Sequence, residues 1–260
     1  TNLQFMLKED ENVIMFTSAT SGEGKTFCAA NLAVSFALLD KKVILIGLDI
    51  RRPRLISLFE LDKTDKGISV LLTRENPTLE EIKENIVPSG INKNLDLLLA
   101  GPVPPNPAEL IARQSLEEIF TILRKEYDYV IVDTAPIGLV SDTLQVGRVV
   151  DASVIVCRAD YTEKSAFGMI NELIATQKLP NVSIAINGID MSRKKYGYAY
   201  GYGKYGKYSK YGRYGYKSNY GKYGSYGAYS SYGSYGYHSY GYGTYTNSHY
   251  GNPEDKSVKQ

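Results

Sequence analysis

The chain has 260 residues and a formal net charge of +2, so it can hold one sizeable domain or two small ones. Its charge is unevenly divided, because residues 1–192 carry 19 Lys/Arg against 26 Asp/Glu and residues 193–260 carry 11 against 2. No apolar run approaches the roughly 18 residues that a membrane-spanning helix needs. We therefore expect an acidic globular body at 1–192 and a basic segment at 193–260 with a separate role.

Six apolar runs, most of them rich in β-branched residues, predict the strands of a sheet. Runs without polar alternation are typical of parallel strands that are covered on both faces. The runs lie at residues 13–18, 43–49, 95–100, 129–133, 152–157 and 182–186. Helical patterns lie between them, and a helix end precedes the first, at residues 1–12, 24–40, 55–59, 67–72, 78–82, 109–125, 141–149 and 163–178. The alternation predicts an α/β fold with a doubly wound, mainly parallel sheet.

Two local signals refine this pattern. Thr78 and Glu81 have the spacing of a helix capping box. The prolines of residues 101–107 exclude both a helix and a central strand there.

A glycine-containing loop follows the first predicted strand and opens a predicted helix. Residues 19–26 read Ala-Thr-Ser-Gly-Glu-Gly-Lys-Thr, a Walker A phosphate loop with alanine in place of its first glycine. Gly22 and Gly24 let successive N–H groups face one anion, and the helix N-terminus adds its positive dipole end. Lys25 is placed to reach the β- and γ-phosphates of a nucleotide, and the Thr26 hydroxyl to ligate Mg²⁺. An accidental Gly-Lys-Thr in an ordinary turn would not explain the flanking strand and helix.

Two predicted strands deliver aspartates, Asp49 and Asp133, to the edge where ligands bind in open α/β sheets. Asp133 is placed as a Walker B aspartate that ligates Mg²⁺ directly or through water, and Asp49 adds a second carboxylate. Each alone could be a helix cap or a turn former, but the neighbouring phosphate loop favours a metal site. Arg158 and Asn187 follow the last two strands, where they either contact adenine or make ordinary loop hydrogen bonds.

These positions define a predicted ATP- and Mg²⁺-binding site. The predicted catalytic residues are Lys25, Asp49 and Asp133, and the predicted metal ligands are Thr26, Asp49 and Asp133. The predicted nucleotide-binding residues are Ser21, Gly22, Glu23, Gly24, Lys25, Thr26, Phe27, Arg158 and Asn187.

The basic segment is built from tyrosine, glycine, serine and lysine. It has almost no aliphatic residues to bury, so we expect it to be disordered when alone. Its tyrosines are Tyr196, Tyr198, Tyr200, Tyr202, Tyr205, Tyr208, Tyr211, Tyr214, Tyr216, Tyr220, Tyr223, Tyr226, Tyr229, Tyr232, Tyr235, Tyr237, Tyr240, Tyr242, Tyr245 and Tyr250.

Taken together, these stretches resemble the bacterial tyrosine kinases (BY-kinases), the cytoplasmic domains of Wzc-like and CpsD-like polysaccharide co-polymerases. Residues 19–26, 44–53 and 130–136 resemble that family's Walker A, Walker A′ and Walker B motifs. Residues 101–110, Gly-Pro-Val-Pro-Pro-Asn-Pro-Ala-Glu-Leu, are similar to another of its segments, and the tyrosine cluster completes the resemblance. The resemblance covers essentially the whole chain.

Two departures from the family pattern stand out. Walker A′ usually reads Asp-x-Asp-x-Arg, whereas this chain has Gly47 at the first position, so the general base is left open between Asp49 and another group. The family also has a Glu-x-x-Arg-x-x-Arg helix before the point where this chain begins at Thr1. We expect the chain to be part of a longer protein, and we expect that oligomerisation helix and the membrane co-polymerase segment to belong to the part that is missing here.

The resemblance implies ATP- and Mg²⁺-dependent autophosphorylation of the C-terminal tyrosines, in trans between subunits of a homo-oligomer. It implies a place at the cytoplasmic face of the bacterial inner membrane, a tyrosine phosphatase as partner, and control of capsule or exopolysaccharide synthesis and export. The fragment itself is expected to be soluble, and no nucleic-acid partner is expected.

Two other interpretations stay open at this point. One is a switch ATPase of the chromosome- and septum-partitioning (MinD/ParA) type, which shares the fold. Such proteins carry a second lysine early in the phosphate loop, which residues 19–22 lack. The other is an adhesive Gly/Tyr segment that acts by stacking and cation–π contacts.

Overall fold

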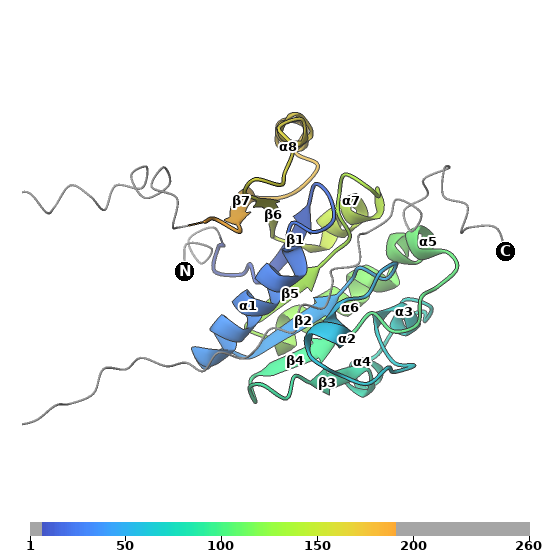
Figure 1. Cartoon of the computed structure of the whole chain (residues 1–260). Coiled ribbons are helices and arrows are strands. Elements are labelled where there is room, and N and C mark those ends of the chain that lie inside the picture. Colours follow the sequence, from blue (N-terminus) through green and yellow to red (C-terminus); the bar gives the residue numbers. More distant parts are fainter. Residues whose placement is uncertain (1–6, 191–260) are drawn as a thin grey trace, which may run out of the picture. The chain divides into compact units, whose positions relative to one another are not determined.

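The computed structural model describes residues 7–190, which form a seven-stranded sheet in the order β3-β4-β2-β5-β1-β6-β7 (Figure 1). Neighbouring strands are parallel throughout except at the β3–β4 edge, which is antiparallel. The strands are β1 Val13–Ser18, β2 Val43–Gly47, β3 Ile86–Pro88, β4 Leu95–Leu98, β5 Tyr129–Asp133, β6 Ala152–Arg158 and β7 Val182–Asn187. The predicted doubly wound, mainly parallel α/β fold is confirmed.

The helices lie in the connections between strands, as the sequence pattern predicts. They are α1 Lys25–Leu38, α2 Leu55–Leu58, α3 Ile68–Leu71, α4 Leu79–Glu84, α5 Pro107–Ala112, α6 Ser115–Glu126, α7 Asp142–Val146, the 3₁₀-helix Gly147–Val149 and α8 Ala166–Ala175. The predicted capping box is present at α4, where Thr78 accepts from the backbone N–H of Glu81 and the Glu81 side chain accepts from that of Thr78. None of the helices in residues 7–190 combines the length and apolarity needed to cross a membrane.

The central strands bury both of their faces. In β1, Val13 and Met15 join the apolar cluster that contains α6, whereas Ile14 and Phe16 join the cluster that contains α1. Figure 1 shows α1 and α6 on different sides of the strands. This two-sided burial explains why the central strands read as continuous apolar runs. Their parallel pairing places their carboxyl ends along one side of the sheet.

The structure corrects the predicted helix at 109–125, which is two helices. Arg113 has an extended backbone (φ −68°, ψ 154°), so α5 ends at Ala112 and α6 starts at Ser115. The predicted exclusion of helix from residues 101–107 is wrong at the last of them, because Pro107 begins α5, where its fixed φ and missing N–H cost nothing.

Three other element predictions were incomplete or wrong. The short edge strand β3 was not predicted; its Pro88 is tolerated because the strand lies at the edge. Helix α8 is shorter than the predicted 163–178. Residues 7–12 are not helical, because the Asn12 side chain donates to the carbonyls of Arg124 and Tyr127 and leads the chain straight into β1.

The remaining predictions about chain organisation fall on residues outside the described range. These are the start of the predicted incoming helix at 1–6, the domain boundary at 192/193, and the disorder and tyrosines of 193–260. They stay predictions.

Candidate active site

The phosphate loop joins the end of β1 to the start of α1. Gly22 (φ 84°) and Gly24 (φ 96°) both have left-handed backbones, which side chains with a Cβ rarely adopt. A side chain at Gly24 would also have no room, because an added Cβ would lie 2.1 Å from Nδ2 of Asn187. Glycine is therefore required twice, and α1 begins with Lys25 directly behind the loop.

Four predicted residues meet where β1, β2 and β5 end. Lys25 Nζ lies 3.3 Å from Asp49 Oδ2 and 3.5 Å from Asp133 Oδ1. The Thr26 hydroxyl donates to Asp133 Oδ2 at 2.8 Å. Lys25, Asp49 and Asp133 are each 2–4% exposed, so their charges act on one another with little screening by water.

Burial raises the pKa of Asp133 to about 6, the largest single effect on this carboxyl. The ammonium of Lys25 and the hydroxyl of Thr26 act in the opposite direction, whereas the charge of Asp49 raises the pKa further. Two carboxylates held around one ammonium thus leave a local excess of negative charge, which a divalent cation would relieve.

Asp49 is oriented by the backbone around it. The N–H of Arg52 donates to Asp49 Oδ1 at 3.1 Å, and the N–H groups of Leu48 and Asp49 both donate to the carbonyl of Asp133. These bonds fix the segment after β2 against the end of β5.

Gly47 stands where the resembled motif has its first aspartate. A Cβ there would meet Leu55 Cδ1 at 3.1 Å and the backbone N of Ala100 at 3.4 Å. Leu55 therefore fills the space beside this position, and Asp49 is the one Walker A′ carboxylate in the described site.

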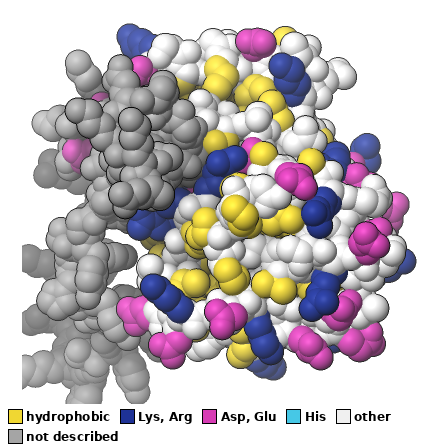
Figure 2. Space-filling view, turned by 90° about the vertical axis from the view of Figure 1, so that its right-hand side faces the viewer, with side chains coloured by type: hydrophobic (Ala, Val, Ile, Leu, Met, Phe, Trp, Pro, Cys, Tyr) yellow, Lys and Arg dark blue, Asp and Glu magenta, His cyan; other side chains and the backbone are white. Residues whose placement is uncertain are grey.

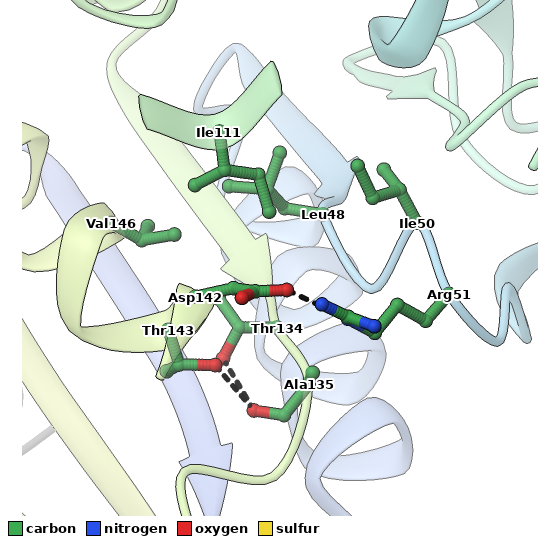
Figure 3. A pocket seen from close by; sticks show the side chains of 9 residues that line it. All are labelled: Leu48, Ile50, Arg51, Ile111, Thr134, Ala135, Asp142, Thr143 and Val146. Carbon is green, nitrogen blue, oxygen red and sulfur yellow. Dashed lines mark hydrogen bonds and ion pairs between the residues drawn. The ribbon is translucent and has the colours of Figure 1, made fainter. Parts of the chain in front are cut away.

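An ion pair that the sequence analysis missed ties Walker A′ to α7. Arg51 Nε donates to Asp142 Oδ2 at 2.7 Å, and the Asp142 side chain is 5% exposed (Figure 3). Beside it, the hydroxyls of Thr134 and Thr143 both donate to the carbonyl of Ala135. The signal was present, since the resembled motif ends in arginine and residues 141–142 open a helix, but nothing local indicates that the two side chains pair.

The remaining predicted nucleotide-binding residues take varied positions. Glu23 is fully buried, and its carboxylate accepts from the N–H of Thr20 and from the Thr162 hydroxyl, so its side chain is occupied within the protein. Phe27 is 46% exposed on the first turn of α1. Arg158 and Asn187 lie at the ends of β6 and β7 and donate to phosphate-loop carbonyls in this structure.

The polar groups of the site fit a magnesium–nucleotide complex. The Ser21 hydroxyl is buried without a hydrogen-bond partner among the described residues, and Asp133 Oδ1 has only the long ion pair with Lys25 Nζ, at 3.5 Å, among them. Residues 7–190 contain no cluster of three His, Cys, Asp or Glu side chains that would hold a metal alone. One or two carboxylates completed by phosphates and water are what Mg²⁺ uses in phosphate-binding sites.

The chain is similar to known proteins over most of its length. A family model described as an AAA domain matches residues 11–186. Tyrosine-protein kinase YwqD of Bacillus subtilis (strain 168) is 40% identical over 200 residues, which cover 76% of this chain and 82% of that protein. The solved kinase domain of Escherichia coli tyrosine kinase ETK has 33% identity and a TM-score of 0.65, covering 77% of this chain and 76% of that one.

A more distant likeness concerns the fold. The septum site-determining protein MinD of Pyrococcus horikoshii OT3, solved with Mg-ADP, has a TM-score of 0.53 at 19% identity and covers 67% of this chain and 69% of its own. At this identity the likeness shows the fold alone, and it confirms the predicted P-loop architecture of the MinD/ParA type.

Proposed function

We propose that this chain, which belongs to the AAA-domain family and within it to the bacterial tyrosine-protein kinases, transfers the γ-phosphoryl group of ATP to tyrosines of its own C-terminal segment. The observation that carries the proposal is the buried cluster at the phosphate loop, where Lys25 lies within 3.5 Å of both Asp49 and Asp133 and Thr26 donates to Asp133. Family membership indicates that tyrosine is the phosphate acceptor. The cluster provides the side chains that would bind the phosphates and the metal ion.

In the proposed roles, Lys25 and the N–H groups of residues 21–26 hold the β- and γ-phosphates. Thr26 and Asp133 hold Mg²⁺, directly or through water, with Asp49 as the second carboxylate. When bound, ATP supplies the phosphoryl group and Mg²⁺ neutralises its developing charge. Ser21, Gly22, Glu23, Gly24, Phe27, Arg158 and Asn187 complete the proposed nucleotide site.

The chemical step requires a tyrosine oxygen in line with the γ-phosphorus. The hydroxyl oxygen forms the new P–O bond while the bond to ADP breaks, and the phenolic proton leaves to a carboxylate or to water. We assign Asp49 as the best candidate for the proton acceptor, because Asp133 accepts the Thr26 hydroxyl and is the proposed metal ligand. Positioning and charge neutralisation carry most of the catalysis in phosphoryl transfer, so one weak base is enough.

The tyrosine-rich segment is the proposed substrate, presented by one copy to the site of another. It starts at a charge of +9 within residues 193–260, against −7 within 1–192. Figure 2 shows acidic side chains scattered among basic ones on the face in view, so attraction would be spread over the surface. Each phosphotyrosine adds about −1.5 to −2 charges, so about five or six would neutralise the segment and weaken its association with the body.

We extend the same proposal to the cellular setting. The partners are other copies of the chain, a membrane co-polymerase and a tyrosine phosphatase, and the site of action is the cytoplasmic face of the inner membrane. The biological role is the control of capsule or exopolysaccharide synthesis and export.

Incubation with ATP and Mg²⁺ should place phosphotyrosine within residues 196–250. We expect this because the chain contains both the residues of the proposed ATP and Mg²⁺ site and the tyrosines that would accept the phosphate. Peptide mass spectrometry locates the phosphate, and a parallel sample with EDTA is the control that should stay unmodified. ATP hydrolysis without any phosphotyrosine would contradict the proposal and favour the switch ATPase.

A further inference from the structure

Three successive carbonyls of the phosphate loop each accept a hydrogen bond from a side chain at the ends of β6 and β7. Tyr161 Oη donates to the carbonyl of Ser21 at 2.9 Å. Arg158 Nη1 donates to that of Gly22 at 3.1 Å, and Asn187 Nδ2 to that of Glu23 at 3.0 Å. We call these three donors, Tyr161, Arg158 and Asn187, the carbonyl clamp.

We propose that Tyr161 is a positioning residue which, with Arg158 and Asn187, holds the phosphate-loop peptides in their phosphate-binding orientation before a nucleotide arrives. This inference rests on the proposed function, since it assumes that the loop binds phosphate. A loop that binds an anion through successive N–H groups must turn the matching carbonyls away from the anion. Donors fixed behind those carbonyls keep the N–H groups directed at the ligand.

The loop needs such support because of its glycines. Gly22 and Gly24 give the backbone the left-handed angles it requires, but glycine also loses the most conformational freedom on ordering. Where outside hydrogen bonds order the loop beforehand, the ligand meets a lower entropic cost on binding.

Close packing shows how tightly the clamp lies against the loop. A Cβ at Gly22 would lie 2.9 Å from Tyr161 Oη, and one at Gly24 only 2.1 Å from Asn187 Nδ2. The two glycines thus serve the clamp as well as the backbone angles, since a side chain at either would push a donor off its carbonyl.

The turn that carries Tyr161 is itself fixed. The N–H groups of Tyr161 and Thr162 donate to the carbonyl of Arg158, and the N–H of Arg158 donates to the Thr162 hydroxyl. The Arg158 guanidinium lies 5.3 Å from the centre of the Tyr161 ring, a cation–π contact. Thr162 then donates to the buried carboxylate of Glu23, which gives the turn a second attachment to the loop.

The clamp differs from adenine contact in what it predicts for Asn187. Both polar atoms of the Asn187 side chain are engaged, since Oδ1 accepts from the N–H of Gly188 at 2.9 Å. A clamp residue affects any phosphate ligand, whereas a base contact affects only ligands that contain adenine. Inorganic tripolyphosphate, which has no base, separates the two.

The test measures binding of Mg-ADP and of Mg-tripolyphosphate by calorimetry, with the full chain. Tyr161→Phe keeps the ring and loses one hydroxyl donor, so we expect both ligands to bind about fivefold more weakly. Asn187→Ala should weaken both by a similar factor. In the kinase assay, Tyr161→Phe should raise KM for ATP while kcat stays near the wild-type value, which a loss of folded protein would not produce.

Tyr127→Phe is the matched control. Tyr127 also donates one hydroxyl hydrogen bond, to Asp96 Oδ2 at 2.8 Å, and neither residue contacts the phosphate loop in the described structure. Its affinities for both ligands should equal those of the wild type.

Unchanged affinity of Tyr161→Phe for both ligands would overturn the proposal. So would an Asn187→Ala protein that loses affinity for Mg-ADP alone, because that pattern marks a base contact. Asn187→Ala carries the test even if Tyr161→Phe does not fold. Failure of the kinase proposal is distinguishable, since the wild type would then bind tripolyphosphate yet form no phosphotyrosine with ATP.

Discussion

Lys25→Met will lower tyrosine phosphorylation by at least about a hundredfold, the usual effect of removing a charge-stabilising group from an active site. Lys25 is the residue of the phosphate loop whose charged end lies between Asp49 and Asp133, at 3.3 and 3.5 Å. Methionine retains much of its length and removes its charge. The rate of phosphotyrosine formation, followed with an antibody or by mass spectrometry, measures the effect.

The fold should survive this substitution. Asp133 already has a raised pKa, so without the ammonium it can take up a proton and avoid a buried charge. Lys42→Met is the matched control, since Lys42 is exposed and pairs only loosely, at 4.0 Å, with Glu126. Lys42→Met should retain full activity, and wild-type phosphorylation by Lys25→Met would end the phosphate-loop interpretation.

Asp133→Asn will lose at least about a hundredfold in rate, and more than Asp49→Asn. Asp133 is the carboxylate that receives the Thr26 hydroxyl at 2.8 Å, so we expect it to carry most of the metal binding. Rates measured across a series of Mg²⁺ concentrations compare the two variants. If Asp49 is also the general base, Asp49→Asn will be nearly inactive even at saturating Mg²⁺.

A larger loss in Asp49→Asn that saturating Mg²⁺ reverses would assign the metal to Asp49. Near-normal turnover by Asp49→Asn would show that the carboxylate missing at Gly47 is replaced from elsewhere or is not needed.

The pH dependence of folding provides an independent check on Asp133. In metal-free protein its pKa is about 6, above the value near 4 of an unfolded aspartate, so the folded state holds the extra proton between these values. The contribution of Asp133 to the unfolding free energy is therefore fully present below about pH 4 and is lost as pH rises through about 6. Asp133→Asn should lack this decline in urea titrations with EDTA.

Features carried by local sequence were predictable. The apolar runs predicted β1, β2, β4, β5, β6 and β7, and the runs are most continuous in the central strands, which are buried on both faces. The phosphate loop was readable because its glycines, lysine and threonine are consecutive. The convergence of Asp49 and Asp133 on Lys25 followed from the parallel sheet, which brings all these carboxyl ends to one edge.

Features that depend on pairs far apart in the chain were not predictable in the same way. Tyr161 and Ser21 are 140 residues apart, and Arg51 and Asp142 are 91 apart. No periodicity or spacing links such residues; only the packed loops at the sheet edge bring them together. The break at Arg113 was also missed, because the apolar pattern continues across it.

Arg158 and Asn187 illustrate an intermediate case. The strand-end rule predicts that they lie near the phosphate loop, and the structure has them there, but the rule does not identify their partners. In the structure their side chains donate to the carbonyls of Gly22 and Glu23, and the rule for strand ends does not specify these partners.

Mixing two forms of the chain tests most directly whether one copy phosphorylates the tyrosines of another. Lys25→Met protein labelled with ¹⁵N is incubated with unlabelled wild-type protein, ATP and Mg²⁺, and peptides from residues 193–260 are separated by mass. We predict phosphotyrosine on the heavy peptides, which come only from the inactive chain. Phosphate confined to the light peptides would show that each chain modifies itself alone, and phosphate on neither would contradict the kinase account.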